Sequence, residues 1–226
     1  MIIAKNVTRT YTGGSESVVA LNDLSIAIDA GERVALLGRS GSGKTTLLNL
    51  LAGLDRPTTG SLEVAGRSLE MLGGRQMADY RLESIGVVFQ SFQLIPQRSA
   101  LQNVALPLIL AGVPHAKRLT MAEQALRRVG LGSRMKHQPF QLSGGEQQRV
   151  AIARAIVNEP PVILADEPTG NLDSTTSGEV MELLLEVVAD NKATLVLVTH
   201  DRELANGFST RIIELADGRL VCGDES

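Results

Sequence analysis

A glycine-rich stretch between an aliphatic run and a helix-like run constrains this chain more than any other feature. Residues 38–45 read Gly-Arg-Ser-Gly-Ser-Gly-Lys-Thr and match the pattern G-x-x-x-x-G-K-[ST]. The aliphatic run Arg33–Leu37 precedes this stretch, and a helical stretch over Lys44–Leu54 follows it. In that order, the backbone N–H groups of the loop surround a phosphate, and the positive end of the helix dipole points at the same anion. The stretch therefore predicts an α/β fold with a nucleotide site.

Two side chains of the loop have predicted roles. Lys44 should reach the β- and γ-phosphates, and the Thr45 hydroxyl should ligate Mg²⁺. A Gly-Ser turn with a chance lysine is the alternative, which the flanking strand and helix disfavour. The residues expected to bind the nucleotide here are Gly38, Arg39, Ser40, Gly41, Ser42, Gly43, Lys44, Thr45 and Thr46.

Three short aliphatic runs predict strands buried on both faces, as in a parallel sheet. They are Arg33–Leu37, Val162–Ala165 and Thr194–Thr199. Each ends in glycine or polar residues, namely Gly38, Asp166 with Glu167, and His200. Because ligands of open α/β sheets bind beyond the carboxyl ends of strands, we expect these three ends to gather around one site.

The rest of the chain predicts a single domain with an inserted helical part. Further strands of a small antiparallel sheet are expected at Ile2–Val7, Leu24–Asp29 and Ser61–Ala65, further helices at Gly144–Asn158 and Ser174–Asn191, and a hairpin at Ile212–Ala216 and Leu220–Cys222 around Asp217-Gly218. Residues 92–140 have no buried-strand run and predict helices broken by Gly112, Pro114, Gly130 and Gly132. We therefore expect a catalytic core with its β-subdomain over 1–91 and 151–226, and a helical subdomain over 92–150.

Composition excludes several classes of protein. A length of 226 residues suits one large domain, and a net charge of −3 argues against a nucleic-acid binder that depends on bulk positive charge. The single cysteine, Cys222, excludes a disulfide-rich scaffold. The apolar piece Val104–Val113 contains Pro107 and is too short to span a bilayer, so it predicts a helix packed in the helical subdomain. A membrane role would therefore require a membrane-embedded partner.

An acidic pair completes the predicted nucleotide site. Asp166, at the end of a buried run, is placed to hold Mg²⁺ through water, and Glu167 is a candidate to polarise the attacking water. Alternatively the pair only caps a helix, with Pro168-Thr169 opening a turn.

The stretch Leu142-Ser-Gly-Gly-Glu146 leads directly into a predicted helix. A serine and two glycines at a helix N-terminus can bind an anion, although Ser143 can also be a simple cap. This stretch, with Gln147–Arg154 after it, resembles the signature sequence and helix of the ATP-binding cassette (ABC) ATPases. Its distance from Asp166 is also the one found in that family. The resemblance covers nearly the whole chain and implies a P-loop NTPase, RecA-like mixed sheet as the core.

That resemblance implies further roles, residue by residue. Tyr11 would stack on adenine, although it can be an ordinary strand-end tyrosine. Gln90 would sense Mg²⁺ and the attacking water, and His200 would hydrogen-bond the γ-phosphate. Asp173 would cross a dimer interface. ATP would lie between two copies of the chain, with Ser143, Gly144 and Gly145 of one copy closing over the phosphates bound by the other. The catalytic set implied is Glu167, His200, Gln90 and Lys44, and the Mg²⁺ ligands are Thr45, Gln90 and Asp166.

Finer motifs resemble one group of cassettes, the lipoprotein-releasing, macrolide-exporting and cell-division ATPases. They are Ala165–Asp173, Gly86–Pro96 and a short loop over Thr12–Ser17. The resemblance implies an ATP-hydrolysing subunit, peripheral at the cytoplasmic face of the membrane, that powers export or extraction through integral membrane subunits and does not bind nucleic acid. A soluble cassette acting on ribosomes or DNA, and an ATP-dependent assembly subunit with little transport, are the alternatives.

The segment Ser91–Ser99 is where a short helix of the membrane subunit would dock, by the same resemblance. Phe92, Leu94 and Ile95 are the apolar side chains expected at this contact. Their alternative role is packing in the core of the chain itself.

Overall fold

The computed structural model of the chain describes residues 1–13 and 16–222, without the side chains of Glu16 and Cys222. The chain forms two compact units. Met1–Arg81 together with Lys192–Ser226 make the first, and Leu82–Asn191 make the second.

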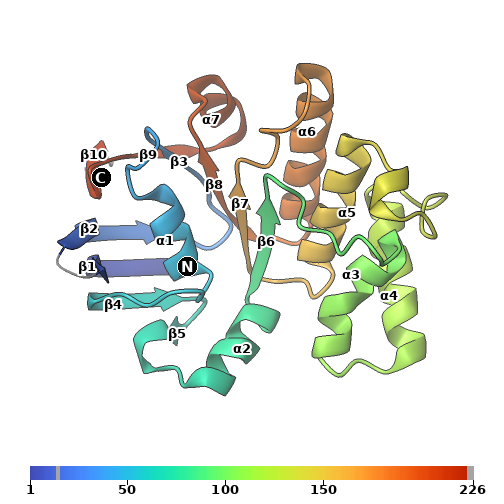
Figure 1. The fold of residues 1–226 in the computed structure, drawn as a ribbon, viewed down its shortest axis with the longest axis horizontal. Coiled ribbons are helices and arrows are strands. Elements are labelled where there is room, and N and C mark those ends of the chain that lie inside the picture. The colour runs from blue at the N-terminus through green and yellow to red at the C-terminus, as the bar shows by residue number, and fades with distance from the viewer. Residues whose placement is uncertain (14–15, 223–226) are drawn as a thin grey trace. The chain divides into compact units, whose positions relative to one another are not determined.

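An antiparallel sheet in the first unit has the strand order β2-β1-β4-β5 (Figure 1). Its strands are β1 (Ile2–Gly13), β2 (Glu16–Ile28), β4 (Thr59–Val64) and β5 (Arg67–Ser68). The expected antiparallel sheet is present, but β1 and β2 run further than the sequence indicated and pair as far as Gly13 and Glu16. Cross-strand pairing, not local apolar pattern, extends them. Residues 14–15 of the expected Thr12–Ser17 loop lie outside the described residues.

The first unit also contains a mixed group of strands: β3 (Arg33–Leu37), β8 (Thr194–Thr199), β9 (Arg211–Ala216) and β10 (Arg219–Cys222). β3 pairs in parallel with both β8 and β9, and β9 forms the expected antiparallel hairpin with β10. All six residues of β8 are buried, which explains why its sequence is an unbroken aliphatic run between two threonines. α7 (Arg202–Phe208) packs Ala205 against Ala35 and Leu37 of β3.

Two helices complete the first unit. α1 (Lys44–Leu51) ends three residues earlier than expected, because the chain turns at Gly53, whose φ is +63°. α2 (Gly74–Glu83) follows a 3₁₀ turn at Leu69–Met71. Tyr80 of α2 is fully buried and donates its hydroxyl to the carbonyl oxygen of Leu51. Apart from Met77 and Tyr80, α2 buries little, so its sequence lacks a clear apolar stripe.

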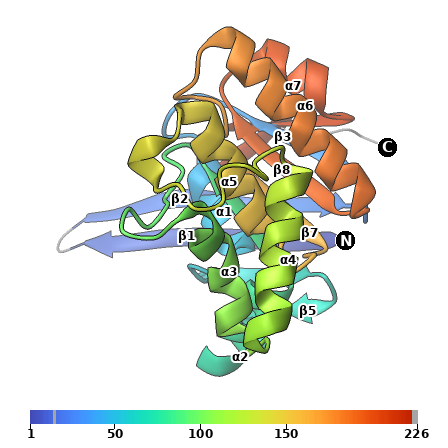
Figure 2. The same ribbon diagram turned by 90° about the vertical axis from the view of Figure 1, so that its right-hand side faces the viewer.

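The second unit pairs β6 (Ile85–Phe89) in parallel with β7 (Val162–Asp166). Its helices are α3 (Ala100–Leu110), α4 (His115–Arg128), α5 (Gly144–Ile156) and α6 (Ser174–Asp190), with a 3₁₀ turn at Pro139–Gln141. α3 and α4 lie side by side, as Figure 2 shows, and both contact α5. Gly112 and Pro114 do separate α3 from α4, and α3 contains Pro107. Within the described part of the chain, no helix is long and apolar enough to cross a membrane.

Candidate active site

The phosphate loop joins β3 to α1, and two of its positions accept only glycine. Gly43 is the N-cap of α1 with φ of +104°, and a Cβ there would lie 2.7 Å from the carbonyl oxygen of Ala20. A Cβ at Gly38 would collide with the carbonyl oxygen of Leu215. Without these side chains the backbone can turn its N–H groups toward a bound phosphate.

Lys44 lies across the loop. The residue is 7% exposed, and its ammonium group donates to the carbonyl oxygens of Gly38 and Arg39, the second at 2.9 Å. The first turn of α1 carries no acidic residue, so the positive end of the helix dipole is not neutralised there. The Ser42 hydroxyl is buried and has no hydrogen-bond partner among the described residues. A buried hydroxyl normally has a partner, so this arrangement fits an anion such as a nucleotide phosphate.

The remaining predicted residues of this loop and His200 border solvent. Arg39, Ser40, Gly41 and Thr45 are exposed, and Thr46 is half-buried. His200 follows β8 directly and is also exposed. The next residue, Asp201, caps α7 by accepting hydrogen bonds from the N–H groups of Glu203 and Leu204 at 2.8 and 3.1 Å. His200 therefore sits at a fixed strand-to-helix junction.

Tyr11 lies on β1, and two neighbours hold its ring. Its hydroxyl donates to Oδ2 of Asp55 at 2.7 Å, and the Arg9 guanidinium lies 4.4 Å from the ring centroid. Arg9 and Asp55 also form an ion pair at 2.9 Å. Burial acts to raise the pKa of Asp55, but the hydrogen bond from Tyr11, the N–H of Arg56 and the charge of Arg9 together lower it. Arg9 therefore covers one face of the Tyr11 ring.

In the second unit, parallel pairing aligns two predicted catalytic residues. Phe89 of β6 pairs with Asp166 of β7. The residues that follow, Gln90 and Glu167, therefore leave adjacent strands at the same level. The sequence predicted Asp166 and Glu167 at the carboxyl end of a buried strand, whereas Gln90 was assigned only through the family resemblance.

The turn after β7 holds the Gln90 side chain. Glu167 has φ of +43°, in the left-handed region, and its carbonyl oxygen accepts from the N–H of Gly170 at 3.0 Å. Gln90 donates to Oδ1 of Asn171 at 3.4 Å, and Asn171 donates to the Gln90 carbonyl oxygen at 2.9 Å. A Cβ at Gly170 would lie 2.7 Å from Nε2 of Gln90, so any other residue there would displace that amide. A left-handed conformation at Glu167 costs about 1–3 kcal/mol and is typical of functional sites.

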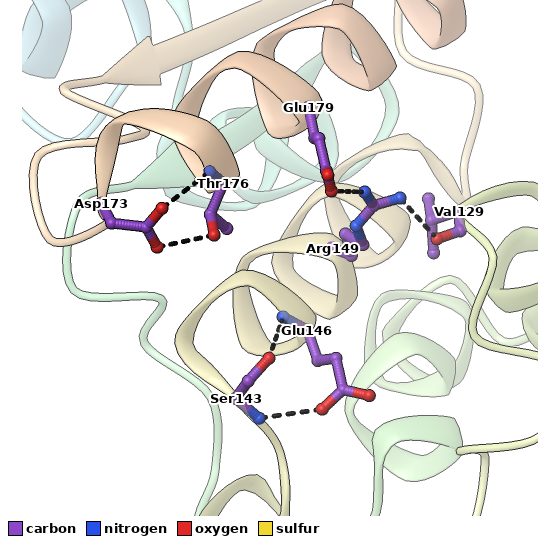
Figure 3. A network of polar contacts seen from close by, with 7 residues as sticks. All are labelled: Val129, Ser143, Glu146, Arg149, Asp173, Thr176 and Glu179. Carbon is purple, nitrogen blue, oxygen red and sulfur yellow. Dashed lines mark hydrogen bonds and ion pairs between the residues drawn. The ribbon is translucent and has the colours of Figure 1, made fainter.

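The predicted signature forms the N-terminus of α5 and is held by a reciprocal cap (Figure 3). Ser143 Oγ accepts from the N–H of Glu146 at 3.2 Å, and Glu146 Oε2 accepts from the N–H of Ser143 at 2.9 Å. Arg134 donates to the other Glu146 oxygen at 3.1 Å. The N–H of Ser143 and the charge of Arg134 lower the pKa of Glu146. Because the Ser143 hydroxyl accepts this bond, its proton stays available for an acceptor such as a phosphate oxygen.

Asp173 caps the neighbouring helix α6 in the same way. Its Oδ1 accepts from the N–H of Thr176 at 3.0 Å, and its Oδ2 accepts from the Thr176 hydroxyl at 2.6 Å, which lowers the pKa of Asp173. A Cβ at Gly145 would lie 2.5 Å from the methyl carbon of Thr176. Figure 3 shows the two helix N-termini next to each other. The structure thus brings Ser143, Gly145 and Asp173 together in the second unit.

Sequence reasoning missed three side chains that support these motifs. Asp55 holds Tyr11 from 44 positions away. Gln148 is fully buried in α5 and donates to the carbonyl oxygens of Phe89 and Pro168, next to Gln90 and Glu167. Arg154 donates to the segment after Gln90. For Gln148 the sequence did carry a signal, because this glutamine lies on the core face of α5, one turn before Ala151 and Ile152.

A family model described as ABC transporter matches residues 21–170, which include the phosphate loop, the signature and the acidic pair. The chain belongs to the ABC transporter family. It is an ATPase domain of that family, and its fold is the mixed α/β fold of the solved ABC cassettes. The resemblance stated from the sequence is therefore confirmed.

Relatives and solved structures agree with this assignment. The lipoprotein-releasing system ATP-binding protein LolD of Syntrophotalea carbinolica is 47% identical over 98% of this chain and 97% of its own length. The macrolide export ATP-binding/permease protein MacB of Rhodopseudomonas palustris is 47% identical over 97% of this chain, which spans only 33% of that protein. The dimeric, post-hydrolysis structure of the ATP-binding cassette MJ0796 bound to ADP and Pi has a TM-score of 0.90 and 43% identity, covering 99% of this chain and 98% of that chain.

Proposed function

We propose that this ABC ATPase is the ATP-hydrolysing subunit of a membrane complex that exports or extracts a substrate such as a lipoprotein, a macrolide-like compound or a peptide. The phosphate loop is the observation that carries the nucleotide function. There a buried lysine, an unpartnered buried hydroxyl and an uncompensated helix N-terminus surround backbone that only glycine permits. The similarity to LolD and MacB supports the export or extraction group.

Within this proposal each predicted side chain has one task. Lys44 and the loop N–H groups bind the ATP phosphates, Tyr11 offers its other face to adenine, and His200 hydrogen-bonds the γ-phosphate. Glu167 accepts a proton from the attacking water at its carboxylate, and Gln90 orients that water.

Magnesium fits the donors that the chain offers. Thr45, Gln90 and Asp166 supply hydroxyl, amide and carboxylate oxygens, the ligands that Mg²⁺ prefers. The described residues contain no group of three His, Cys, Asp or Glu side chains able to hold a metal alone. The ion would therefore keep water and phosphate oxygens as further ligands, and it would neutralise charge on the phosphates.

A second copy of the chain is the proposed partner in hydrolysis. Ser143, Gly144, Gly145 and Asp173 would contact the ATP held by the other copy, giving two equivalent sites. The dimeric state of the MJ0796 cassette supports this arrangement. Neighbouring N-termini of α5 and α6 present these residues together, as a shared interface requires.

Integral membrane subunits are the second class of partner, with the chain peripheral at the cytoplasmic face of the membrane. The segment Ser91–Ser99 is the proposed contact, and its apolar residues Phe92, Leu94 and Ile95 are only half-buried in the chain. As predicted from the sequence, residues 1–226 would act as one ABC ATPase domain whose helical subdomain covers 92–150.

Replacing Glu167 with glutamine tests this function. Glu167→Gln removes the proton acceptor but not the shape of the site, so ATP binding should persist while hydrolysis falls at least about 100-fold. The variant should elute as a dimer with Mg·ATP and as a monomer without nucleotide, measured by size exclusion with light scattering. Glu182→Gln is the matched control, because Glu182 is exposed on α6 and the charge change is the same. Normal turnover in Glu167→Gln would contradict the assignment.

A further inference from the structure

In the part of the chain that the structure describes, Arg154 of α5 is bound to two carbonyl oxygens and to no carboxylate. Its Nη1 donates to the carbonyl oxygen of Gln93 at 2.6 Å, and its Nη2 donates to that of Phe92 at 2.9 Å. The guanidinium is partly buried, and burial lowers the pKa of Arg154. Among the residues described, no ion pair joins Arg154 to a carboxylate, whereas Arg134 and Arg149 each form one. A partly buried cation without an anion is costly, so its position calls for a reason beyond simple ion pairing.

The two residues that Arg154 binds have unfavourable backbone conformations. Phe92 and Gln93 have φ of +57° and +49°, in the left-handed region that side chains with a Cβ rarely adopt. Two such residues in sequence would relax if nothing held them. Because Arg154 bonds to both carbonyl oxygens, its planar fork selects this conformation.

Two more contacts attach this part of the chain to α5, one just before the segment and one within it. Gln148 donates to the carbonyl oxygen of Phe89 at 3.3 Å. A Cβ placed on Gly144 would lie 3.8 Å from the end of the Phe92 ring, so the ring reaches the first turn of α5. α5 therefore contacts the segment at its own N-terminal turn and at Arg154, and between these two points Gln148 binds the end of β6.

We propose that Arg154 is a positioning residue that fastens Ser91–Gln93 to α5, so that this segment and Ser143–Gly145 move as one body. This inference rests on the proposed function, in which the segment contacts a membrane subunit and Ser143–Gly145 contacts ATP. A displacement of Ser91–Gln93 would then displace Ser143–Gly145, and the reverse. By linkage, ATP binding must change the segment as much as a contact at the segment changes ATP binding.

Amide hydrogen exchange of the full chain tests the attachment. In a Glu167→Gln background, Mg·ATP should slow exchange in peptides covering residues 90–97 at least about threefold. Arg154→Lys keeps the charge but loses the fork, so this response should disappear while ATP affinity stays within about twofold. Without nucleotide, exchange of the same peptides should rise at least about threefold.

Arg149→Lys is the matched control. Arg149 also lies on α5, but its hydrogen bonds go to Glu179 at 3.2 Å and to the carbonyl oxygen of Val129 at 3.5 Å (Figure 3), not to Ser91–Gln93. Its replacement should leave exchange of residues 90–97 unchanged with and without ATP.

A glycine substitution separates positioning from general packing. Glycine adopts the left-handed conformation without penalty, so Gln93→Gly should restore much of the lost ATP response in Arg154→Lys. If Arg154 only helped α5 to pack, Gln93→Gly would not restore the ATP response. If Arg154→Lys does not fold, Phe92→Leu, which shortens the side chain against Gly144, is judged by the same exchange measurements.

Two results would overturn the inference. One is an unchanged ATP response and unchanged basal exchange in Arg154→Lys. The other is an equal effect of Arg149→Lys. A parent chain that binds no ATP would instead refute the proposed function, and the nucleotide-free comparison would still decide whether Arg154 holds the segment.

Discussion

Replacing Gly145 with alanine puts a methyl group against the first turn of α6. The new Cβ would lie 2.5 Å from the methyl carbon of Thr176, closer than carbon atoms approach in proteins. Thr176 cannot simply rotate away, because its hydroxyl is bonded to Asp173 at 2.6 Å. Either α5 shifts relative to α6 or the cap of α6 is lost.

The expected cost follows from two opposing effects. Overpacking a tight contact costs about 1–3 kcal/mol, and the fixed Thr176 places this case at the upper end. Alanine in a helix is more favourable than glycine by about 1 kcal/mol. The net loss in the free energy of unfolding should be about 2 kcal/mol, which lowers the thermal midpoint by about 4–8 °C.

Thermal unfolding of three further variants isolates the contact. Thr176→Ser removes the methyl group and keeps the hydroxyl, so Gly145→Ala with Thr176→Ser should recover most of the lost stability. Gly144→Ala is the control, because its nearest neighbour would be the flexible end of Leu172 at 3.1 Å. If Gly145→Ala melts within 1 °C of the parent, or Thr176→Ser gives no rescue, the contact does not act as reasoned.

Three other changes have definite expectations. Lys44→Ala removes the buried ammonium of the phosphate loop, so equilibrium titration should show ATP affinity reduced at least about 100-fold, and near-normal turnover would refute the loop assignment. The pKa of Glu146 is lowered in the folded chain, so its ionised form adds stability above the unfolded-state pKa, and this stability is lost as pH falls through the lower folded value. Glu146→Gln should therefore be less stable than the parent at pH 7 and equal to it once Glu146 is protonated. Urea unfolding at a series of pH values measures this difference. Asp55→Asn weakens the hold on Tyr11, so the KM for ATP should rise while kcat stays near normal, and a lower kcat alone would contradict a role in base binding.

Local sequence patterns predicted much of the fold. Arg33–Leu37 and Thr194–Thr199 became β3 and β8 without a change of bounds, because strands buried on both faces need continuous aliphatic side chains. Asp217-Gly218 predicted the hairpin between β9 and β10 from turn chemistry alone. α2 and the ends of β1 and β2 were not predicted, since α2 buries only Met77 and Tyr80 and the long strands extend by pairing with each other.

In the candidate site too, the sequence predicted some features and left others open. The phosphate loop and the acidic pair were found from local patterns, and Gln90 and Asp173 from the family resemblance; the residues in the second unit lie at strand ends and helix N-termini. Their roles in catalysis and their ATP contacts stay predictions. Membership of the ABC transporter family, in contrast, is confirmed.

By itself, the sequence determined the phosphate loop, the signature helix and the buried strands β3 and β8, because each depends on residues within one short stretch. Only the tertiary structure decided how those stretches are held. Asp55 holds Tyr11, Thr176 limits residue 145 to glycine, and Arg154 binds carbonyl oxygens some 60 positions earlier. These contacts join residues far apart in the chain, and backbone carbonyl oxygens are present at every position. No local pattern can therefore show which of them a distant side chain will bind.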